Sequence, residues 1–265
     1  MHALLMSHWS APGGFTERNL LFWRLAHALA IRHYGGVHLI TDTPGASALS
    51  CLDWLSVDTS LDELGEEQSN IWSLGKIMAY GVAARRFGSF AHIDGDVFLW
   101  RPLPGHLLNA AAFAQHPEGV QHFYDLRSLD ILPVSHPATF RRPATVPNMG
   151  ITGGTDSSFW IRYSDECLDW VRQPANRAVW NQHRLWWGAI LAEQWFMGAF
   201  AEDAGADIAY LFGGVPSDSD AEQARFTHLL GAKSLPDIAE RVRRRLASNP
   251  PNLDPVLSVD IGVTA

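Results

Sequence analysis

Two aspartates separated by one glycine, Asp94 and Asp96, follow a short apolar run in the first half of the chain. The flanking runs Phe90–Ile93 and Val97–Trp100 are apolar enough to be strands buried on both faces. Two carboxylates this close repel each other unless a cation or hydrogen-bond donors satisfy them. Gly95 leaves the space above it free of a side chain. The arrangement suits a hard divalent cation that bridges protein and phosphate oxygens; the competing interpretation is a turn that closes a hairpin.

Three basic positions could complete a site of this kind. His228 is a good ligand for a transition ion such as manganese, and Lys233, two residues after Gly231, is a good phosphate partner. Lys76 lies in the helix-like stretch that leads into the strand before the aspartates. The structural alternatives are a buried histidine without a ligand and a solvated surface lysine.

Two polar stretches in the second half could line a ligand. Asn148 offers both a donor and an acceptor, and the glycines in Asn148–Gly154 leave room beside it. An ordinary strand with a turn is the alternative for this stretch. Glu193 and Gln194 interrupt an otherwise apolar helix, which costs free energy unless they face a cleft or form structural hydrogen bonds.

Alternating strands and helices are predicted to position these residues. Core strands are predicted at Ala3–Met6, Val37–Ile40 and Phe90–Ile93, with helices between them, one of these over Ala46–Leu55, and a short strand is expected within Ser56–Leu61. This order is typical of an open α/β sheet that is covered on both faces. In such sheets ligands bind beyond the carboxyl ends of the strands. Ser7, Asp42 and Asp94 all follow strands, so we expect them to meet in one cleft.

The second half is predicted to be less regular. An aromatic helix is expected over Leu185–Phe200, a late strand over Ile208–Phe212 and a last helix from Pro236 to Leu246. The stretch Glu118–Pro147 is rich in His, Pro and Arg and has weak periodicity, which is typical of a functional or mobile loop. It is one of the places where we expect an acceptor to bind, together with Trp186–Trp187.

The composition excludes several classes of protein. The chain has 265 residues, 47% of them hydrophobic, and a formal net charge of −8, which argues against a general nucleic-acid binder. The longest hydrophobic segment, Leu20–Ile31, is broken by Arg24 and His27, so no transmembrane segment is expected. The chain has only two cysteines, without metal-type spacing, and no basic leader precedes its first apolar run. A cytoplasmic location is therefore expected.

In their order along the chain, these motifs resemble those of the GT-A fold glycosyltransferases, in particular the group with glycogenin-like and bacterial galactosyl- and glucosyltransferases. More closely, the chain resembles a bacterial family of unknown function with the same Asp-x-Asp core. The shared stretches are Ser7–Ser10, Thr41–Asp42, Trp72–Ile77, His92–Phe98, Asn148 with Gly150, Gly153 and Gly154, and Thr227–Leu229 with Gly231 and Lys233. The chain departs from the glycogenin-like pattern in its short middle region and in the Gly-Ala-Lys that ends the last motif.

The resemblance, over about residues 1 to 245, implies a fold and a division of the chain. The fold is a GT-A-like (Rossmann-like) open mixed sheet flanked by helices, in a single domain over residues 1–246. Within it, residues 1–110 form a nucleotide-binding half and residues 111–246 a half for the donor sugar and acceptor. A C-terminal tail, residues 247–265, lies outside the resemblance.

The resemblance also implies an activity, namely metal-dependent transfer of a hexose-type sugar from a nucleoside diphosphate sugar, expected to be a UDP-sugar, with retention of configuration. Mn²⁺ or Mg²⁺ would be held by Asp94, Asp96 and His228. The residues matching nucleotide-contacting positions are Ser7, His8, Trp9, Asp42, Lys76, Asp94, Gly231 and Lys233. Those matching the sugar pocket and the catalytic positions are Asn148, Gly150, Gly153, Gly154, Glu193 and Gln194. The acceptor is left open among a small molecule, a glycan and a peptide.

Two other functions are compatible with parts of this pattern. A non-catalytic sugar-nucleotide-binding protein would keep the same fold but lack a working acceptor site. Phosphatases with an aspartate nucleophile also carry Asp-x-Asp after a strand, normally the first strand of the core. Here the motif follows several elements, and Phe98 stands where those enzymes have a small residue, which disfavours the phosphatase.

Overall fold

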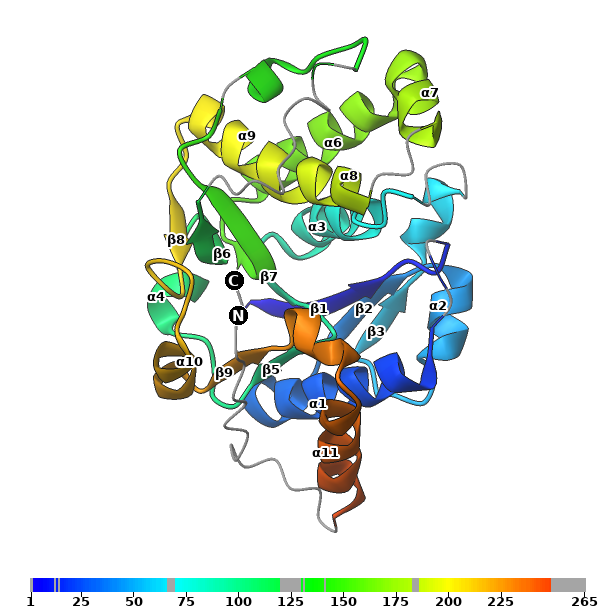
Figure 1. Cartoon of the computed structure of the whole chain (residues 1–265), viewed down its shortest axis with the longest axis vertical. Coiled ribbons are helices and arrows are strands. Elements are labelled where there is room, and N and C mark those ends of the chain that lie inside the picture. Colours follow the sequence, from blue (N-terminus) through cyan, green and yellow to red (C-terminus); the bar gives the residue numbers. More distant parts are fainter. Residues whose placement is uncertain are drawn as a thin grey trace.

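The computed structural model describes residues 2–248, apart from residues 12, 14, 66–69, 120–129, 131, 141 and 183–185. A mixed sheet of seven strands, in the order β3-β2-β1-β4-β7-β6-β8, crosses the molecule with helices on both faces (Figure 1). Its strands are β1 (Ala3–His8), β2 (His38–Thr41), β3 (Ser56–Asp58), β4 (Phe90–Ile93), β6 (Ala112–Glu118), β7 (Val146–Gly154) and β8 (Ile208–Tyr210). A second sheet pairs β5 (Val97–Leu99) with β9 (Phe226–His228). The expected mixed α/β sheet flanked by helices is confirmed.

Ten α-helices are described along the chain. They are α1 (Glu17–Tyr34), α2 (Thr43–Ala48), α3 (Leu74–Phe87), α4 (Gly105–Leu108), α6 (Ser157–Arg172), α7 (Pro174–Gln182), α8 (Trp186–Ile190), α9 (Phe196–Ala204), α10 (Asp218–Ala224) and α11 (Pro236–Ala247). Three short 3₁₀ turns, η1 (Ser60–Leu64), η2 (Pro137–Phe140) and η4 (Leu230–Ser234), and one π turn, η3 (Leu191–Trp195), complete the described elements.

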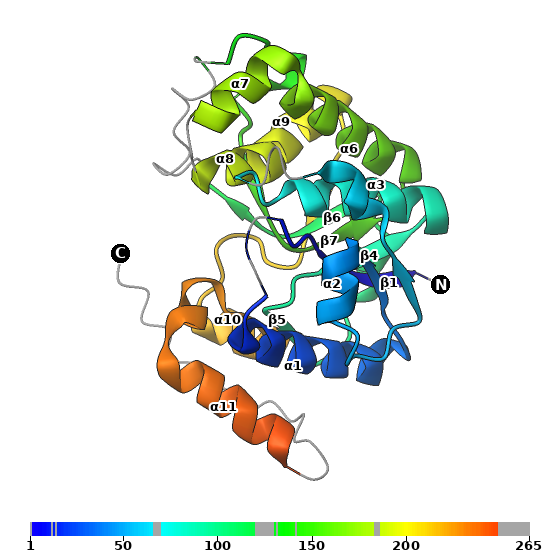
Figure 2. The same cartoon turned by 90° about the vertical axis from the view of Figure 1, so that its right-hand side faces the viewer.

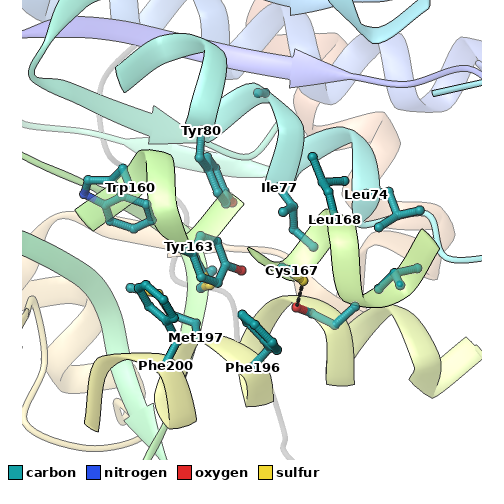
Figure 3. Close-up of a cluster of buried hydrophobic side chains, with 14 of the residues drawn as sticks. Leu74, Ile77, Tyr80, Trp160, Tyr163, Cys167, Leu168, Phe196, Met197 and Phe200 are labelled. Atoms are coloured by element: carbon teal, nitrogen blue, oxygen red, sulfur yellow. Dashed lines mark hydrogen bonds between the residues drawn. The ribbon is translucent and has the colours of Figure 1, made fainter. Parts of the chain in front are cut away.

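The hydrophobic core has two layers because side chains alternate across the sheet. In β1, Leu4 and Met6 pack towards α1 and α11, whereas Leu5 packs towards α3, α6 and α9. Figure 2 shows the same two layers of helices from a view at right angles. The upper layer is strongly aromatic, with Tyr80 and Tyr163 packed among the rings of α6 and α9 (Figure 3).

Local signals in the sequence explain where several elements begin and end. The Thr16 hydroxyl accepts a hydrogen bond from the Asn19 N–H and caps α1, and Gly35, at φ 78°, ends that helix. Asp156 caps α6 in the same way. These helix boundaries are read from sequence because the partners lie within a few residues of each other.

Other elements differ from their prediction. The helix expected over Ala46–Leu55 is instead α2, over Thr43–Ala48, and it begins earlier because the Asp42 side chain accepts from the Gly45 N–H and caps it. The aromatic helix expected over Leu185–Phe200 is divided by the π turn η3. The strand β9 is not expected from the sequence, and it pairs with the distant β5.

The strand order determines where a ligand can bind. From β1 the chain builds outward to β2 and β3 and then returns to the other side of β1 to form β4, all four strands being parallel. Where strand order reverses in this way, the carboxyl ends of the neighbouring strands leave a crevice. Ser7 and Asp94 therefore lie at the same edge, at the ends of β1 and β4. From residue 249 on, the expected tail lies outside the described residues, as do residues 120–129, 131 and 141 of the expected acceptor loop.

Candidate metal centre

The Asp94-Gly95-Asp96 turn connects the two sheets. The Asp94 N–H donates to the Gly150 carbonyl of β7 (2.9 Å), and the Asp96 carbonyl accepts from the Leu229 N–H (3.1 Å). A Cβ at Gly95 would lie 2.0 Å from the indole nitrogen of Trp23. Only glycine therefore lets the turn pack this closely against α1.

His228 reaches this turn through strand pairing. In the β5–β9 ladder, His228 lies opposite Val97, the residue that follows Asp96. One ligand atom from each of Asp94, Asp96 and His228 lies within 4.8 Å of the others. We call these three residues the acid–histidine cluster. The structure thus brings together the three residues that the resemblance assigned to a metal.

The charges of the cluster favour metal binding at neutral pH. Burial raises the pKa of Asp94 to about 6, with Asp96 adding to the rise and Lys76 opposing it. Burial also acts to raise the pKa of Asp96, but His228 and Lys233 outweigh it and bring that pKa below its usual value. Burial lowers the pKa of His228, against the pull of the two aspartates. At pH 7 the cluster therefore holds two carboxylates and a neutral imidazole, which is the protonation state that a metal needs.

Gln115 contacts the other side of the His228 ring and was missed by the sequence analysis. Its Oε1 lies 2.8 Å from His228 Nδ1, and Gln115 is buried in β6. The only signal in the sequence is a polar residue at the end of the apolar run 111–114. Nothing in that run points to a histidine 113 residues further along the chain.

Lys76 is held between two carboxylates. Its Nζ lies 3.0 Å from Asp94 Oδ1 and 2.7 Å from Glu193 Oε1, and donates to the Met149 carbonyl at 3.3 Å. Burial would lower the pKa of Lys76, but Asp94 and Glu193 outweigh it and raise that pKa above its usual value. We call Asp94, Lys76 and Glu193 the buried ion triad. The N–H donors of Lys76 thus meet groups within the protein, and the contact with phosphate or donor sugar that the resemblance implies stays a prediction.

Glu193 lies beneath this lysine in the π turn η3. Its side chain is 1% exposed, and Oε1 also accepts from the Tyr80 hydroxyl at 3.0 Å. The Tyr163 hydroxyl donates to the Glu193 carbonyl at 2.8 Å; both tyrosines appear in Figure 3. Glu193 therefore forms the structural hydrogen bonds that were the alternative for it, and the contact with a transferred sugar stays a prediction. Gln194, the next residue, is half-buried.

Lys233 lies on the open side of the cluster. Its Nζ is 3.1 Å from Asp96 Oδ2, and its side chain is 56% exposed. It belongs to η4, in which Gly231 is exposed and a Cβ would meet nothing within 4 Å. Lys233 therefore has both the exposure and the position to meet an anion, and the phosphate contact that the resemblance implies stays a prediction.

With this geometry established, comparison with known proteins places the chain. Residues 7–253 match a family described as "Family of unknown function (DUF6734)". The chain belongs to this family. A comparison with curated proteins gives no match. Among solved structures, the chain is similar to the apo form of mouse xyloside xylosyltransferase 1, with 12% identity, a TM-score of 0.44, and coverage of 79% of this chain and 84% of that one.

The residues expected to hold a nucleotide near β1 differ in how far their side chains are engaged in contacts within the protein. Ser7 Oγ lies 2.9 Å from His92 Nε2, and His8 makes edge-on contacts with the rings of Phe15 and Trp23. Trp9 is buried in the core, and the nucleotide contact that the resemblance implies for it stays a prediction.

Asp42 supports the loop that follows β1. Its carboxylate accepts from the Ser10 N–H at 2.9 Å, from the Ser10 hydroxyl at 2.6 Å and from the Gly45 N–H at 3.0 Å. Asp42 therefore caps α2 and holds this loop, and the contact with a nucleotide that the resemblance implies stays a prediction.

The Asn148–Gly154 stretch is the buried strand β7, and its two ends differ. Asn148 accepts from the Gly150 N–H and donates to Glu118 (2.8 Å), close to the cluster. Gly153 and Gly154 pair with the start of β4, away from the cluster, and a Cβ on either would strike a neighbouring carbonyl. Their lack of side chains thus serves strand packing, and the sugar-pocket role expected of them is not supported.

Within the described ranges, no helix has the length and apolar character that crossing a membrane requires.

Proposed function

We propose that this protein is a metal-dependent glycosyltransferase whose donor is a nucleoside diphosphate sugar. The observation that carries the proposal is the acid–histidine cluster, in which one atom from each residue lies within 4.8 Å of the others at the crevice of the sheet. Lys233 adds a cation beside the cluster, although it lies 137 residues from Asp96 in the sequence. An anionic ligand with a divalent cation is the chemistry that such a site accepts.

The donor set fits the metals expected. Carboxylate oxygens suit Mg²⁺ and Mn²⁺, and an imidazole nitrogen favours Mn²⁺ of the two. Bound there, the ion would neutralise the negative charge that develops on the diphosphate as the bond to the sugar breaks.

The two lysines of the chain take different roles in this proposal. Lys233 is exposed enough to donate to a phosphate oxygen once Asp96 has another cationic partner. Lys76 remains in the buried ion triad, where it compensates the charges of Asp94 and Glu193 and holds Asp94 at the end of β4. Lys76 is thus a positioning residue and Lys233 a ligand-binding one.

The finer features of the reaction follow from the resemblance of the motifs. They are a UDP-sugar as donor, retention of configuration, and Gln194 and Asn148 beside the transferred sugar. Ser7 and His8, at the end of β1, remain the proposed contacts for the base. The acceptor is a small molecule, a glycan or a peptide.

Calorimetric titration of UDP, with and without Mn²⁺, tests the proposal. UDP should bind in a metal-dependent way, and Asp96→Asn should abolish that dependence because one ligand loses its charge. Asp218→Asn is the matched control, since Asp218 is exposed on α10 and makes the same change of charge. Metal-independent binding, or binding unchanged in Asp96→Asn, would contradict the proposal.

Turnover separates the enzyme from its alternative. A panel of UDP-, GDP- and ADP-linked sugars is incubated with the protein and Mn²⁺, and release of the nucleoside diphosphate is measured. Slow hydrolysis of one donor, lost in Asp96→Asn, is the result expected of a transferase without its acceptor. Tight, metal-dependent binding of a donor with no hydrolysis and no transfer would indicate the non-catalytic sugar-nucleotide-binding protein.

A further inference from the structure

The contact between His228 and Gln115 determines which ring nitrogen can bind a ligand. Gln115 lies on β6 of the large sheet and His228 on β9 of the small one, and Oε1 of the glutamine is 2.8 Å from Nδ1 of the histidine. Both side chains are buried: Gln115 is 1% exposed and the His228 side chain 8% exposed. Water therefore does not compete for this hydrogen bond.

The chemistry of the two groups assigns the proton. Oε1 of Gln115 faces His228 Nδ1 and an amide oxygen can only accept a hydrogen bond, so this geometry assigns the hydrogen to Nδ1. The neutral ring then has its lone pair on Nε2, which faces Asp96 Oδ1 at 3.6 Å. The opposite tautomer would put a hydrogen on Nε2 and prevent it from coordinating a metal.

The backbone makes room for this pair of side chains. The register between β6 and β7 shifts between Ala114 and His116, and Gly150 lies in the shifted part of β7. A Cβ on Gly150 would lie 2.4 Å from His228 Cε1 and 2.5 Å from Gln115 Oε1. The Gly150 carbonyl also accepts from the Asp94 N–H. Gly150 thus leaves room for the side chains of His228 and Gln115, and its carbonyl fixes the backbone of Asp94.

We propose that Gln115 is a positioning residue that holds His228 in the tautomer whose Nε2 is free to coordinate a divalent cation. The inference rests on the proposed function, because it assumes that the acid–histidine cluster binds a metal. It adds a residue outside the shared motifs, which acts through His228 without touching the substrate.

Two substitutions separate positioning from simple packing. Gln115→Leu keeps a side chain of similar size but removes the acceptor, whereas Gln115→Glu keeps an acceptor at the same place. With the full chain and Mn²⁺ alone as the probe, calorimetry should give a Kd about 10- to 100-fold higher for Gln115→Leu, as is usual when the partner of a metal-binding histidine is lost. Gln115→Glu should stay within a few-fold of the wild-type Kd. Melting of the metal-free variants reports on the fold.

The tautomer is measured directly in the wild-type protein. Long-range ¹H–¹⁵N NMR spectra of the metal-free chain should show His228 with a protonated Nδ1 and a bare Nε2, the signals being assigned by their loss in His228→Asn. In Gln115→Leu the same ring should show both tautomers. This measurement decides the question even where Gln115→Leu folds poorly.

Four results would overturn the inference. A protonated Nε2 on His228 in the wild type contradicts it outright. Equal Mn²⁺ affinity in wild type and Gln115→Leu, or equal losses in Gln115→Leu and Gln115→Glu, would make Gln115 a packing residue while the proposed function stands. Absence of any Mn²⁺ binding to the wild type would overturn the proposed function, and this inference with it.

Discussion

At the scale of single residues, the site depends on which buried charged groups pair with each other. Asp96 lies between His228 and Lys233, while Asp94 lies against Lys76. Each aspartate is therefore compensated by protein cations before any ligand arrives. A bound divalent cation must compete both with these partners and with protons.

The competition with protons predicts a pH dependence. Because the pKa of Asp94 is raised to about 6, Mn²⁺ affinity should be constant from pH 8 to 7 and fall as the pH drops below about 6. The fall should be about tenfold per pH unit for one displaced proton. His228 adds to the loss only at lower pH, because burial lowers its pKa. Calorimetry with Mn²⁺ from pH 5 to 8 measures this, and a flat affinity over that range would disprove the assignment of Asp94.

Lys233 and His228 should affect different ligands. Lys233→Ala should leave the affinity for Mn²⁺ alone within a few-fold of wild type but weaken UDP binding in the presence of Mn²⁺ by about tenfold, which is about 1.4 kcal/mol. His228→Ala should weaken both. Arg244→Ala, an exposed cation on α11, is the control. Titrations that show Lys233→Ala and His228→Ala with the same profile would contradict the division of roles.

At the scale of elements, the site is assembled where strand ends and turns from the two sheets meet. β4 and β5 flank the two aspartates, β9 brings the histidine, and the irregular part of β7 makes space for its ring. On the far side, α3 and the π turn η3 contribute Lys76 and Glu193. π turns are rare and occur often at functional sites; here the turn carries the carboxylate that pairs with the lysine.

Gly150 tests the space that β7 makes. Gly150→Ala should lower Mn²⁺ affinity and cost about 1–3 kcal/mol of unfolding free energy, because the new Cβ would overlap His228 and Gln115. Gly231→Ala is the matched control, since a Cβ there would meet nothing within 4 Å, and its effect should stay within about 0.5 kcal/mol. Urea unfolding with and without Mn²⁺ measures both. Equal behaviour of the two variants would show that the close approach at Gly150 does not matter.

The buried ion triad links α3, η3 and the end of β4, so breaking it should lower the free energy of unfolding. Lys76→Met should lower the unfolding free energy by about 3–5 kcal/mol, because it leaves two buried carboxylates without their cation. Mn²⁺ should restore part of that loss by compensating Asp94. Arg86→Met, which breaks an exposed pair with Asp58, should cost less than about 1 kcal/mol. A small effect of Lys76→Met in urea would mean that Glu193 and Asp94 are compensated in another way.

At the scale of the whole molecule, the proposed ligand would bridge two layers. The cluster lies where the large sheet, with its aromatic upper layer, meets the small sheet and α1 below it (Figures 1 and 2). A ligand bound only by the folded chain stabilises it by mass action, about 2.7 kcal/mol at 100 times its Kd.

The rise in Tm that each nucleotide causes therefore measures which nucleotide the protein prefers. UDP with Mn²⁺ should raise the Tm by several degrees, more than GDP or ADP at the same concentration, and EDTA should remove the shift. The expected order rests on the resemblance of the motifs to enzymes that use UDP-sugars. Equal shifts from the three nucleotides would remove the preference for UDP without affecting the metal site.

The sequence by itself determined the features that depend on neighbouring residues. Thr16 begins α1 and Gly35 ends it, each through contacts with residues at most four positions away. Apolar runs predicted the core strands. The two aspartates were expected at the end of a buried strand because that strand, their turn and the flanking apolar run lie within eleven residues.

Only the tertiary structure decided which side chains share the site and which are used elsewhere. His228 joins the aspartates through β9, a three-residue strand that exists because it pairs with β5. Lys76 and Asp42, which were also candidates for the site, have partners within the protein: Lys76 pairs with Glu193, and Asp42 accepts a hydrogen bond from the Ser10 hydroxyl. A sequence shows that a side chain can donate or accept, but its partner is set by long-range packing, as with Gln115, 113 residues from His228.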